Sequence, residues 1–431
     1  MHGRRSGLRP RGKKLWIISA GVLLVTAVTA ACSSSSSSSS TTTSAANGGS
    51  GSNASSKCGT PVPVGPANPT GVYKTLSPEL QKIYTSYPGT LEASPWATQK
   101  ITAKPPWKIG YIAFAITNQY NKNVLTQLKT EFALAKKQGL VKGSLVTNIP
   151  ATFAQSTPEG QIAAIQQMVR QGVNAIILLP VDSVSETPAM EAAGKAGVPV
   201  ILADTPPAPG AKYTLSVWTQ NQVEADAGSL GLIKKGDILI VRGIAGNQND
   251  VVLYNQKIAD LKNCPDIHVA STLYGNWDNG TAKNVVSQYL ASHPQPIAGV
   301  LQDGGMFAGV VQAYEARGGS VPVVGVEQCY GGDLSWWLER KSSYKTVAGC
   351  INGFQGGYVF MNVALRTLMG KGPKYNVLSI PAVTIDNTNL ESYATPGLPL
   401  TSDAELPGPK TAWCNNVCLN KYFVRSGAAT R

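Results

Sequence analysis

Three acidic residues stand where predicted strands end in this chain of 431 residues. Asp204, Asp303 and Glu327 each follow closely on a short apolar run of strand length. In open α/β sheets, ligands bind outside the carboxyl ends of the strands. A carboxylate in that place accepts charge-assisted hydrogen bonds from paired hydroxyl groups. The three acids therefore predict a site for a small-molecule ligand at these strand ends.

The segment 172–205 indicates how one of these acids is positioned. Residues 174–179 form an apolar run rich in isoleucine and leucine, which is typical of a parallel strand covered on both faces. Asp182 is a suitable cap for the helix that follows, and Gly197 ends that helix. A second apolar run then leads into Asp204. The pattern predicts a strand–helix–strand unit with this carboxylate at the carboxyl end of a strand.

Two series of such units follow one another along the chain. From Lys108 to Asp204, and again from about residue 220 to Glu327, apolar runs of strand length alternate with segments of helical periodicity. The last of these runs, residues 321–326, is expected to be one strand that leads into Glu327. This alternation predicts parallel, doubly wound sheets. The expected fold class is therefore α/β, with two doubly wound parallel-sheet domains and a ligand cleft between them.

The length of the chain exceeds what one hydrophobic core usually contains, which indicates two domains with extensions. The formal net charge is +13, but six of the 37 basic residues lie within the first fourteen positions. Without those six, 31 basic residues face 24 acidic ones, a net charge of +7. Such an excess suits anionic membrane or cell-wall surroundings. No basic patch interleaved with aromatic residues occurs, which argues against nucleic acid as a partner.

The first 31 residues have the layout of a secretory signal peptide, a basic start followed by a long apolar run. The sequence Thr-Ala-Ala-Cys that ends at Cys32 resembles a bacterial lipobox, although Thr29 stands where leucine is commonest. We expect a lipid on Cys32 that anchors the protein to the outer face of the cell membrane. An uncleaved anchor or an unmodified cysteine is the alternative. The serine-rich segment 32–57 is expected to form a flexible tether.

Residues 108 to about 385 resemble the periplasmic sugar-binding proteins of the ribose-binding type, the solute receptors of ABC importers. The resemblance depends on the order of several segments, among them KIGYIAFAITNQY, IILLPVDS, GVPVILADT, NWDNGTAKNVVSQYLASHP, VLQDGGMFAG and VPVVGVEQ. It implies two discontinuous domains joined by three crossover segments. Proline-rich composition on either side of them indicates an extension at each end. The implied bounds are 108–219 with 350–381 for the first domain, 220–349 with 382–400 for the second, 58–107 for the N-terminal extension and 401–431 for the C-terminal extension.

The same resemblance implies ligand-binding roles for six residues. Asn118 and Tyr120 follow the first strand, where the family carries asparagine and stacking aromatic residues, and Trp277 falls where the family has a further aromatic residue. An aromatic face suits the C–H side of a sugar ring, and an amide suits its hydroxyl groups. The three acids introduced above match polar residues at the family's strand ends. Structural roles are the alternative: an exposed loop position for Tyr120, a core or rim position for Trp277, and helix caps for the acids.

Two positions depart from the family in a way that bears on the charge of the ligand. Thr205 and Val251 stand where ribose-type proteins carry arginine. Three acids without those arginines would leave uncompensated charge in a closed cleft, which is costly. Either Arg242 turns into the cleft, or the ligand carries positive charge, as an amino sugar or an aminated polyol does.

Six cysteines remain when Cys32 is set aside, an even number in an exported chain, and fifteen pairings are formally possible. A disulfide between Cys329 and Cys350 is favoured, because both end strand-like segments at the expected domain crossover. Cys414 with Cys418, or either of them with Cys58, is the second choice. No CxxC spacing occurs and the three histidines are isolated, so we expect no metal site.

Taken together, these features predict an extracytoplasmic lipoprotein that delivers a sugar, a polyol or an amino sugar to an ABC permease by hinge closure. We expect it to act as a monomer, without a cofactor and without catalysis. Two alternatives stay open. A ligand sensor or co-receptor shares this fold, and a glycoside hydrolase could use a carboxylate pair such as Asp204 and Glu327. A DNA-binding repressor would need a helix-turn-helix ahead of the core, where this chain has its leader and tether.

Overall fold

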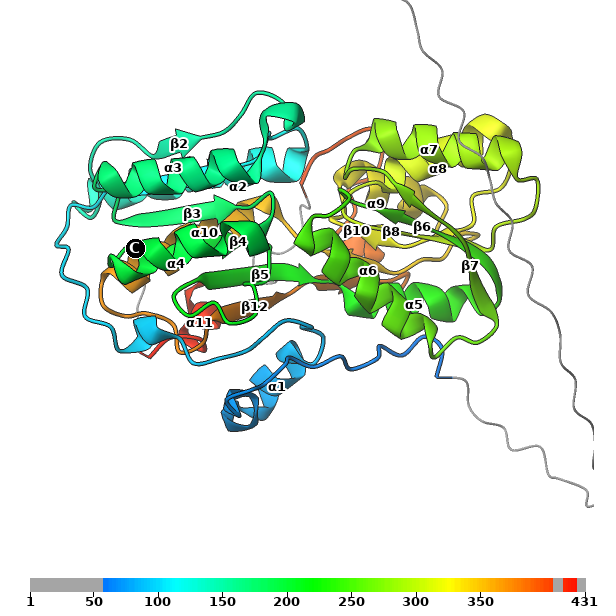
Figure 1. Ribbon diagram of the computed structural model, residues 1–431. Coiled ribbons are helices and arrows are strands. Elements are labelled where there is room, and N and C mark those ends of the chain that lie inside the picture. Colours follow the sequence, from blue (N-terminus) through cyan, green and yellow to red (C-terminus); the bar gives the residue numbers. More distant parts are fainter. Residues whose placement is uncertain (1–56, 406–413, 425–431) are drawn as a thin grey trace, which may run out of the picture. The chain divides into compact units, whose positions relative to one another are not determined.

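The computed structural model describes residues 57–405 and 414–424. The predicted signal peptide, the lipidated Cys32 and nearly all of the tether lie outside the described residues. Helices and strands alternate along most of the described chain, as the apolar runs predict (Figure 1). Within this part of the chain, no helix is long and apolar enough to cross a membrane.

The first lobe is built on a sheet of six strands in the order β12-β5-β4-β3-β1-β2, and every neighbouring pair is parallel. Strands β1, β3 and β4 are buried along their whole length, which explains why their sequences are apolar throughout instead of alternating. The strands are β1 (Ile109–Ala113), β2 (Val146–Asn148), β3 (Ala175–Leu179), β4 (Val200–Ala203), β5 (Leu215–Asn221) and β12 (Val377–Pro381).

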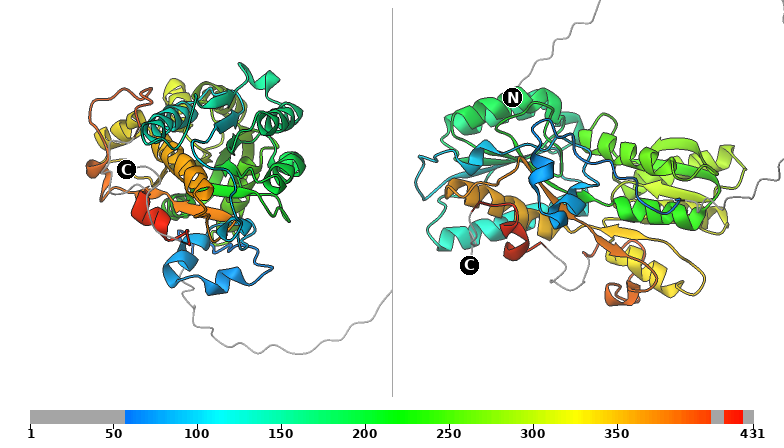
Figure 2. Two further views of the ribbon diagram at one scale, coloured as in Figure 1. Left: turned by 90° about the vertical axis from the view of Figure 1, so that its left-hand side faces the viewer. Right: turned by 90° about the horizontal axis from the view of Figure 1, so that it is seen from below.

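Helices cover both faces of this sheet (Figures 1 and 2). On one face, Leu128 of α2 and Val359 of α10 share a buried core with Ile177 of β3. On the other face, Ile165 of α3 packs with Ile176, the next residue of the same strand, because successive strand side chains point to opposite faces. The helices are α2 (Gln119–Lys137), α3 (Pro158–Arg170), α4 (Ser183–Lys195) and α10 (Gly353–Leu368).

The second lobe repeats this plan with a four-stranded parallel sheet in the order β7-β6-β8-β9. Val286 of α7 and Val310 of α8 share a core with Leu239 on one face, and Leu230 of α5 packs with Ile240 on the other. The elements are β6 (Gly236–Arg242), β7 (Ile267–Tyr274), β8 (Gly299–Gln302), β9 (Val323–Val324), α5 (Val223–Ile233), α6 (Gln248–Leu261), α7 (Asn279–Ser292) and α8 (Phe307–Arg317).

The chain passes between the lobes at a small third sheet, in the order β10-β11-β13. The three passages run from β5 to α5, from β11 to α10 and from β12 to β13. The elements here are β10 (Val326–Glu327), β11 (Ala348–Cys350), β13 (Val383–Ile385) and the neighbouring α9 (Gly331–Glu339). The predicted fold class, α/β with parallel sheets, is confirmed.

Two elements differ from the prediction. The segment 215–221 is a strand, β5, although no strand was predicted there; it pairs with β4 on one side and β12 on the other. The run 321–326, predicted as one strand, is divided at Gly325 into β9 and β10, which belong to different sheets. The division moves Glu327 out of the second lobe's main sheet and into the crossover region.

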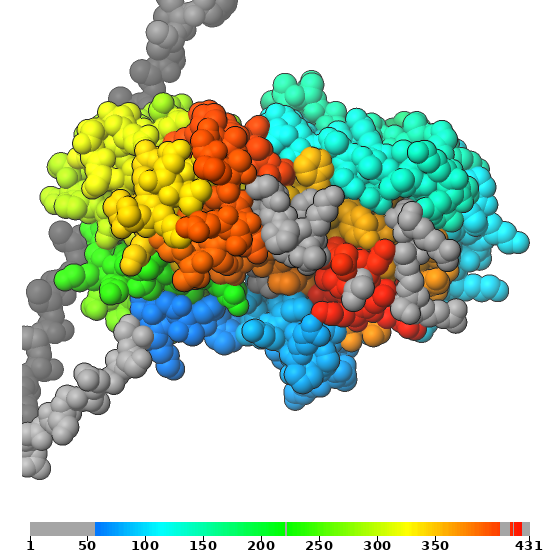
Figure 3. Space-filling view, turned by 180° about the vertical axis from the view of Figure 1, so that it is seen from behind, coloured from blue at the N-terminus to red at the C-terminus, as the bar shows by residue number. Residues whose placement is uncertain are grey.

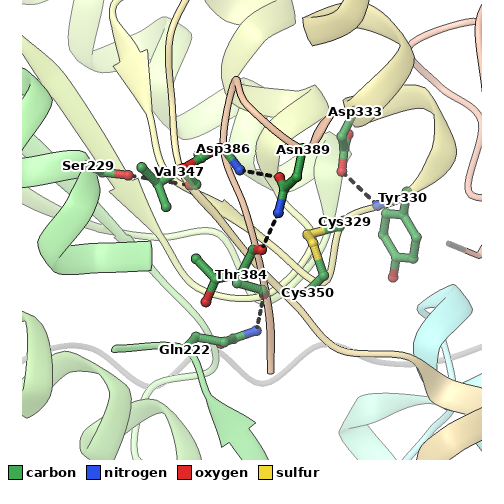
Figure 4. The surroundings of a disulfide bond; sticks show 12 residues. Gln222, Ser229, Cys329, Tyr330, Asp333, Val347, Cys350, Thr384, Asp386 and Asn389 are labelled. Atoms are coloured by element: carbon green, nitrogen blue, oxygen red, sulfur yellow. Dashed lines mark hydrogen bonds between the residues drawn. A yellow bond between two sulfur atoms is a disulfide. The ribbon is translucent and has the colours of Figure 1, made fainter. Parts of the chain in front are cut away.

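Three disulfides join described residues. Cys329 bonds to Cys350, as predicted, and Cys414 bonds to Cys418. The suggested pairing of Cys58 with one of the C-terminal cysteines is wrong, because Cys58 bonds to Cys264. Figure 4 shows that the Cys329–Cys350 bond lies at the crossover, where the Nε2 of Gln222 donates to the carbonyl oxygen of Gly349 at 3.1 Å.

The N-terminal extension contacts both lobes (Figures 1 and 2). On the second lobe, the Cys58 disulfide is followed by a hydrogen bond of 2.7 Å from the backbone N–H of Val62 to Asp260. On the first lobe, the Oη of Tyr84, at the end of α1 (Pro78–Tyr84), donates to the carbonyl oxygen of Val377 at 2.5 Å. The extension therefore joins the two lobes outside the three crossovers.

The C-terminal segment 398–405 makes a second such connection (Figure 3, orange to red). The carbonyl oxygen of Ala404 accepts a bond of 2.7 Å from the N–H of Gly331 at the start of α9. Glu405 then accepts bonds from the Nδ2 of Asn123 on α2, at 2.7 Å, and from the N–H of Gly353 on α10, at 3.1 Å. Farther on, α11 (Asn416–Asn420) is held by the buried Arg366 of α10.

Candidate ligand-binding site

A pocket lies between the two lobes, and both contribute to its lining. The cavity between them is about 30 Å³, room for about one or two water molecules, so a sugar fits only when the lobes stand farther apart than in this structure. Four of the six predicted ligand-binding residues line it, and Asp303 and Glu327 do not. The first lobe supplies Phe114, Asn118, Tyr120, Asn121, Leu179, Asp204 and Thr205, and the second lobe supplies Asn247, Asn249, Trp277, Gly304 and Gln328.

Asp204 and Tyr120 form the buried floor of this pocket. Asp204 follows β4 directly, and its backbone takes a left-handed conformation (φ 55°), which aspartate tolerates better than most residues. Its carboxylate accepts hydrogen bonds from the Oη of Tyr120, at 3.1 Å, and from the Oγ1 of Thr219. Burial and the neighbouring Asp204 charge raise the pKa of Tyr120 well above its usual value, so the phenol stays protonated and acts as the donor.

Tyr120 is thus not an exposed loop residue, because only 3% of it is accessible. It lies in the first turn of α2, which Asn118 caps by accepting a bond of 2.9 Å from the N–H of Asn121. Since the side-chain oxygen of Asn118 is engaged in this cap, its NH₂ group is what it offers to a ligand.

Trp277 forms the opposite wall, on the loop between β7 and α7. Its backbone is also left-handed (φ 55°), and the indole is half-buried. The ring lies so close to Gly243 that a Cβ on that residue would stand 2.1 Å from the indole Cε2. Glycine at this strand end is therefore needed for the indole to take its place beside the pocket.

Asp303 and Glu327 lie in the core of the second lobe, where they surround a buried lysine. The Nζ of Lys257 is 2.7 Å from an oxygen of Asp303, 2.8 Å from Glu327 and 3.1 Å from Asp226. All four side chains are almost completely buried. The other oxygen of Glu327 accepts a bond of 2.7 Å from the N–H of Gly304, which lines the pocket. The acid cluster thus supports the pocket wall from behind.

Asp303 and Glu327 were predicted to follow strands and to point toward the ligand. They do follow strands, but both side chains contact Lys257 and do not line the pocket. Lys257 was missed, and it follows Leu253 by four residues on the inward-facing side of α6. A lysine on the side of a helix that faces the core is a signal that a buried acidic partner is near, since lysine is rarely buried without one.

This cluster removes the premise that three uncompensated acids face the ligand. Burial raises the pKa of Glu327 to about 8 and that of Asp226 to about 7, although the Lys257 ammonium opposes both shifts. Burial alone would lower the pKa of Lys257, but the surrounding carboxylates raise it well above its usual value. The ammonium is therefore kept, and near neutral pH part of the acid charge is neutralised by protons.

Arg242 does not turn into the pocket. Its guanidinium forms a paired bond with Asp250, with an NH2–Oδ2 distance of 2.6 Å. It also lies over the rings of Tyr254 and Tyr274, at 4.0 and 5.1 Å from their centroids. The first of the two sequence-based alternatives for balancing the pocket's charge is wrong.

Polar residues that the sequence reasoning missed hold the lobes together around the pocket. Asn247 caps α6 and donates from its Nδ2 to the carbonyl oxygen of Val181 in the first lobe, at 3.3 Å. The Oη of Tyr330 accepts a bond of 3.3 Å from the N–H of Tyr120 and donates to Gln328 at 3.2 Å. Asn247 and Gln328 each follow a predicted strand or its loop, so position alone could have identified them.

Among residues 57–405 and 414–424, no group of three or more histidine, cysteine, aspartate or glutamate side chains is arranged to hold a metal ion. The chemistry of the pocket is that of hydrogen bonding and ring contact: a buried carboxylate, amides, a phenol and an indole face. Such groups bind the hydroxyls and the C–H faces of polyhydroxylated molecules.

Comparison with known proteins agrees with this geometry. The xylitol-binding protein of Mycolicibacterium smegmatis is 26% identical over 275 residues, which cover 61% of this chain and 76% of that protein. The D-ribose/D-allose-binding protein of Pseudomonas aeruginosa is 28% identical over 226 residues, or 47% of this chain and 69% of that protein. An ABC transporter solute-binding protein from Thermobispora bispora superposes with a TM-score of 0.61 at 21% identity, covering 75% of this chain and 99% of that one.

A family model described as a periplasmic binding protein domain matches residues 109–371, more than half of the chain. Proteins of this family are non-enzymatic components of transport systems, so the glycoside hydrolase alternative is set aside. Two parallel-sheet lobes with a pocket between them, and the match along both lobes, lead to one conclusion: the chain belongs to the periplasmic binding protein family.

Proposed function

We propose that this protein captures a small neutral sugar or polyol outside the cell and delivers it to the membrane permease of an ABC importer. The observation that carries the proposal is the pocket in which Asp204 and Tyr120 of one lobe face Trp277 of the other. The names of the relatives, which refer to xylitol and to D-ribose and D-allose, support this class of ligand.

Each group in the pocket has a role in this proposal. The Asp204 carboxylate accepts bonds from two hydroxyls of the ligand. The NH₂ group of Asn118 donates to a further hydroxyl, and the Trp277 indole covers a C–H face. Because these contacts come from both lobes, a ligand gains all of them only when the lobes are closed. Binding therefore shifts the population toward the closed form, which the permease recognises.

We propose a neutral ligand, where the sequence suggested one that carries an amino group. Asp303 and Glu327 are held by Lys257, so they exert much less attraction on a cationic ligand than three free carboxylates would. Asp204 alone belongs to the pocket, and a carboxylate that accepts hydroxyl bonds needs no cationic ligand.

The proposal includes the membrane anchor. A lipid on Cys32 and the tether 32–57 would keep the binding protein, as a monomer, close to its permease on the outer face of the membrane. Labelling of expressing cells with a fatty-acid analogue should mark the wild-type protein and not Cys32→Ala.

Calorimetry with D-ribose, D-allose, xylitol, myo-inositol and D-glucosamine tests the ligand class. At least one neutral compound should bind, and Asp204→Asn should weaken it by about tenfold to hundredfold, the loss of a charge-assisted bond. The melting temperature should change little. Asp278→Asn is a matched control, since Asp278 caps α7 beside Trp277 outside the pocket. Preferential binding of D-glucosamine, or undiminished affinity in Asp204→Asn, would contradict the proposal.

A further inference from the structure

A second and larger cavity adjoins the ligand pocket, and we call it the outer chamber. It shares Phe114 and Asn247 with the pocket, and both lobes line it. Its volume is about 540 Å³, against about 30 Å³ for the pocket. Small-molecule sites in proteins usually measure about 300–1,000 Å³. The outer chamber is therefore large enough to hold part of a ligand whose other part lies in the pocket.

The chamber presents an aromatic ring that the fold holds in place. Phe153 stacks on Phe114, with ring centroids 5.5 Å apart, and yet 38% of it is exposed. The turn that carries Phe153 is fixed by Ser156, whose Oγ accepts a bond of 2.9 Å from the N–H of Ala115 and donates to the carbonyl oxygen of Thr152 at 3.1 Å. Because this ring is apolar, exposed and fixed in place, covering it with another apolar group would remove its surface from water and lower the free energy.

Most polar side-chain atoms of the chamber already take part in the protein's own hydrogen bonds. The hydroxyl of Ser156 accepts from Ala115, beyond the end of β1, and donates to Thr152 within its turn. One oxygen of the Asp182 carboxylate caps α4 by accepting a bond of 3.0 Å from the N–H of Val184. Asn247 accepts from Asn249 at 2.9 Å, and its Nδ2 donates to Val181. A second hydroxyl-rich ring would find few partners here, whereas an apolar group would find aromatic and aliphatic surface.

On these grounds we propose that the outer chamber is a subsite for an apolar group, and that the ligand is a glycoside with an alkyl or aryl aglycone. The sugar or polyol part lies in the pocket, against Asp204 and Trp277, and the aglycone covers Phe153 between the lobes. This inference rests on the proposed function, because it needs the polar part of the ligand in the pocket.

The test is calorimetry of the full chain with matched pairs of probes: D-ribose with phenyl β-D-ribofuranoside, and D-allose with phenyl β-D-allopyranoside. In the wild type, at least one phenyl glycoside should bind about tenfold to hundredfold tighter than its parent sugar, from burial of the ring. In Phe153→Ala this ratio should fall toward one, and Phe153→Tyr should keep most of it. Leu134→Ala, which removes a similarly exposed apolar side chain on α2 (36%), should leave the ratio unchanged.

Three results would overturn the subsite: phenyl glycosides that bind no tighter than their parents, a gain that survives Phe153→Ala, or an equal gain for an unsubstituted disaccharide of the same sugar. If a parent sugar binds but its phenyl glycoside shows no gain, the subsite fails and the proposed function stands. If neither member of either pair binds, the subsite fails, and the wider ligand panel above decides the proposed function independently.

Discussion

Lys257 determines which acids of the second lobe are available to a ligand. Its ammonium lies within 3.1 Å of oxygens from Asp226, Asp303 and Glu327, and the whole group is buried. Three carboxylates and one lysine cannot all be charged in such a place without a large cost, so protons are retained. The cluster is thus a charge-balanced part of the core. It also helps to fix the pocket wall, because Glu327 accepts a hydrogen bond from the backbone N–H of Gly304, which lines the pocket.

Replacing this lysine gives a prediction at the scale of the residue. Lys257→Met should lower the free energy of unfolding by about 3–5 kcal/mol, because it leaves buried acids without their partner. Urea unfolding measures the loss. Lys262→Met, which changes an exposed lysine at the C-terminal cap of α6, is the control and should have little effect. An equal loss in both variants would contradict the assigned role.

The same cluster predicts how stability depends on pH. The pKa values of Glu327 and Asp226 are raised on folding, to about 8 and about 7. The native state therefore binds more protons than the unfolded state between about pH 4 and pH 8. The contribution of the two acids to stability is complete below about pH 4, where both states are protonated, falls as pH rises, and is lost once pH passes 7 to 8. The loss caused by Lys257→Met should be larger at pH 8.5 than at pH 6, since neutralising the acids by protons becomes costlier.

At the scale of elements, the disulfides differ in what they constrain. The Cys58–Cys264 bond joins residues 206 positions apart, and the Cys414–Cys418 bond joins residues only four apart. In the chain-entropy account, the stabilisation grows with the length of the closed loop. The first bond should therefore contribute more to the free energy of unfolding.

Paired serine variants test this difference. Cys58→Ser with Cys264→Ser should cost about 5 kcal/mol, and Cys414→Ser with Cys418→Ser about 2 kcal/mol, by urea unfolding under non-reducing conditions. The second pair serves as the control for the loss of a cystine as such. Equal costs would mean that local packing, and not loop length, sets the contribution.

Much of the element order followed from the sequence, and its failures have a common cause. The apolar runs before Asp182 and Asp204 predicted β3 and β4, and the Asp182 cap was predicted correctly, because these signals are local. The orientation of Glu327 was not, because its partner Lys257 lies 70 residues away. The partner of Cys58 was missed for the same reason. Long-range pairing of polar groups left no periodic pattern to detect.

The residues of the site also fall into those that local signals predicted and those that depend on long-range contacts. Asn118, Tyr120, Asp204 and Trp277 lie next to predicted strand ends, and the structure brings them into one pocket. The outer chamber was not predicted, since Phe153 lies in a short turn whose position depends on hydrogen bonds to β1's end rather than on a repeating pattern.

At the scale of the whole molecule, the terminal extensions restrain the lobes. Segment 398–405 bonds to α9 in the second lobe and, through Glu405, to Asn123 and Gly353 in the first. Glu405→Ala should let the lobes separate more often, because the hydrogen bonds from Asn123 and Gly353 that join segment 398–405 to the first lobe are lost. The expected result is a larger radius of gyration without ligand in small-angle scattering, and a several-fold faster dissociation of ligand.

Glu391→Ala is the matched control for this variant. Glu391 lies in the same C-terminal part of the chain, but it forms an ion pair with Lys341, within the second lobe, at 2.7 Å. It should change neither the radius of gyration nor the dissociation rate. If Glu405→Ala behaved in the same way, the segment would be packed on the lobes without restraining them.

The Cys58–Cys264 bond also affects how a mechanical force on the preceding chain is transmitted to the folded part. Cys264 lies between α6 and β7, so a force arriving along the chain before Cys58 passes through this covalent link into the second lobe. The same force also reaches the first lobe along the backbone, because the extension continues from Cys58 into β1. The disulfide therefore divides the load between the two lobes, whereas the backbone alone would load only the first.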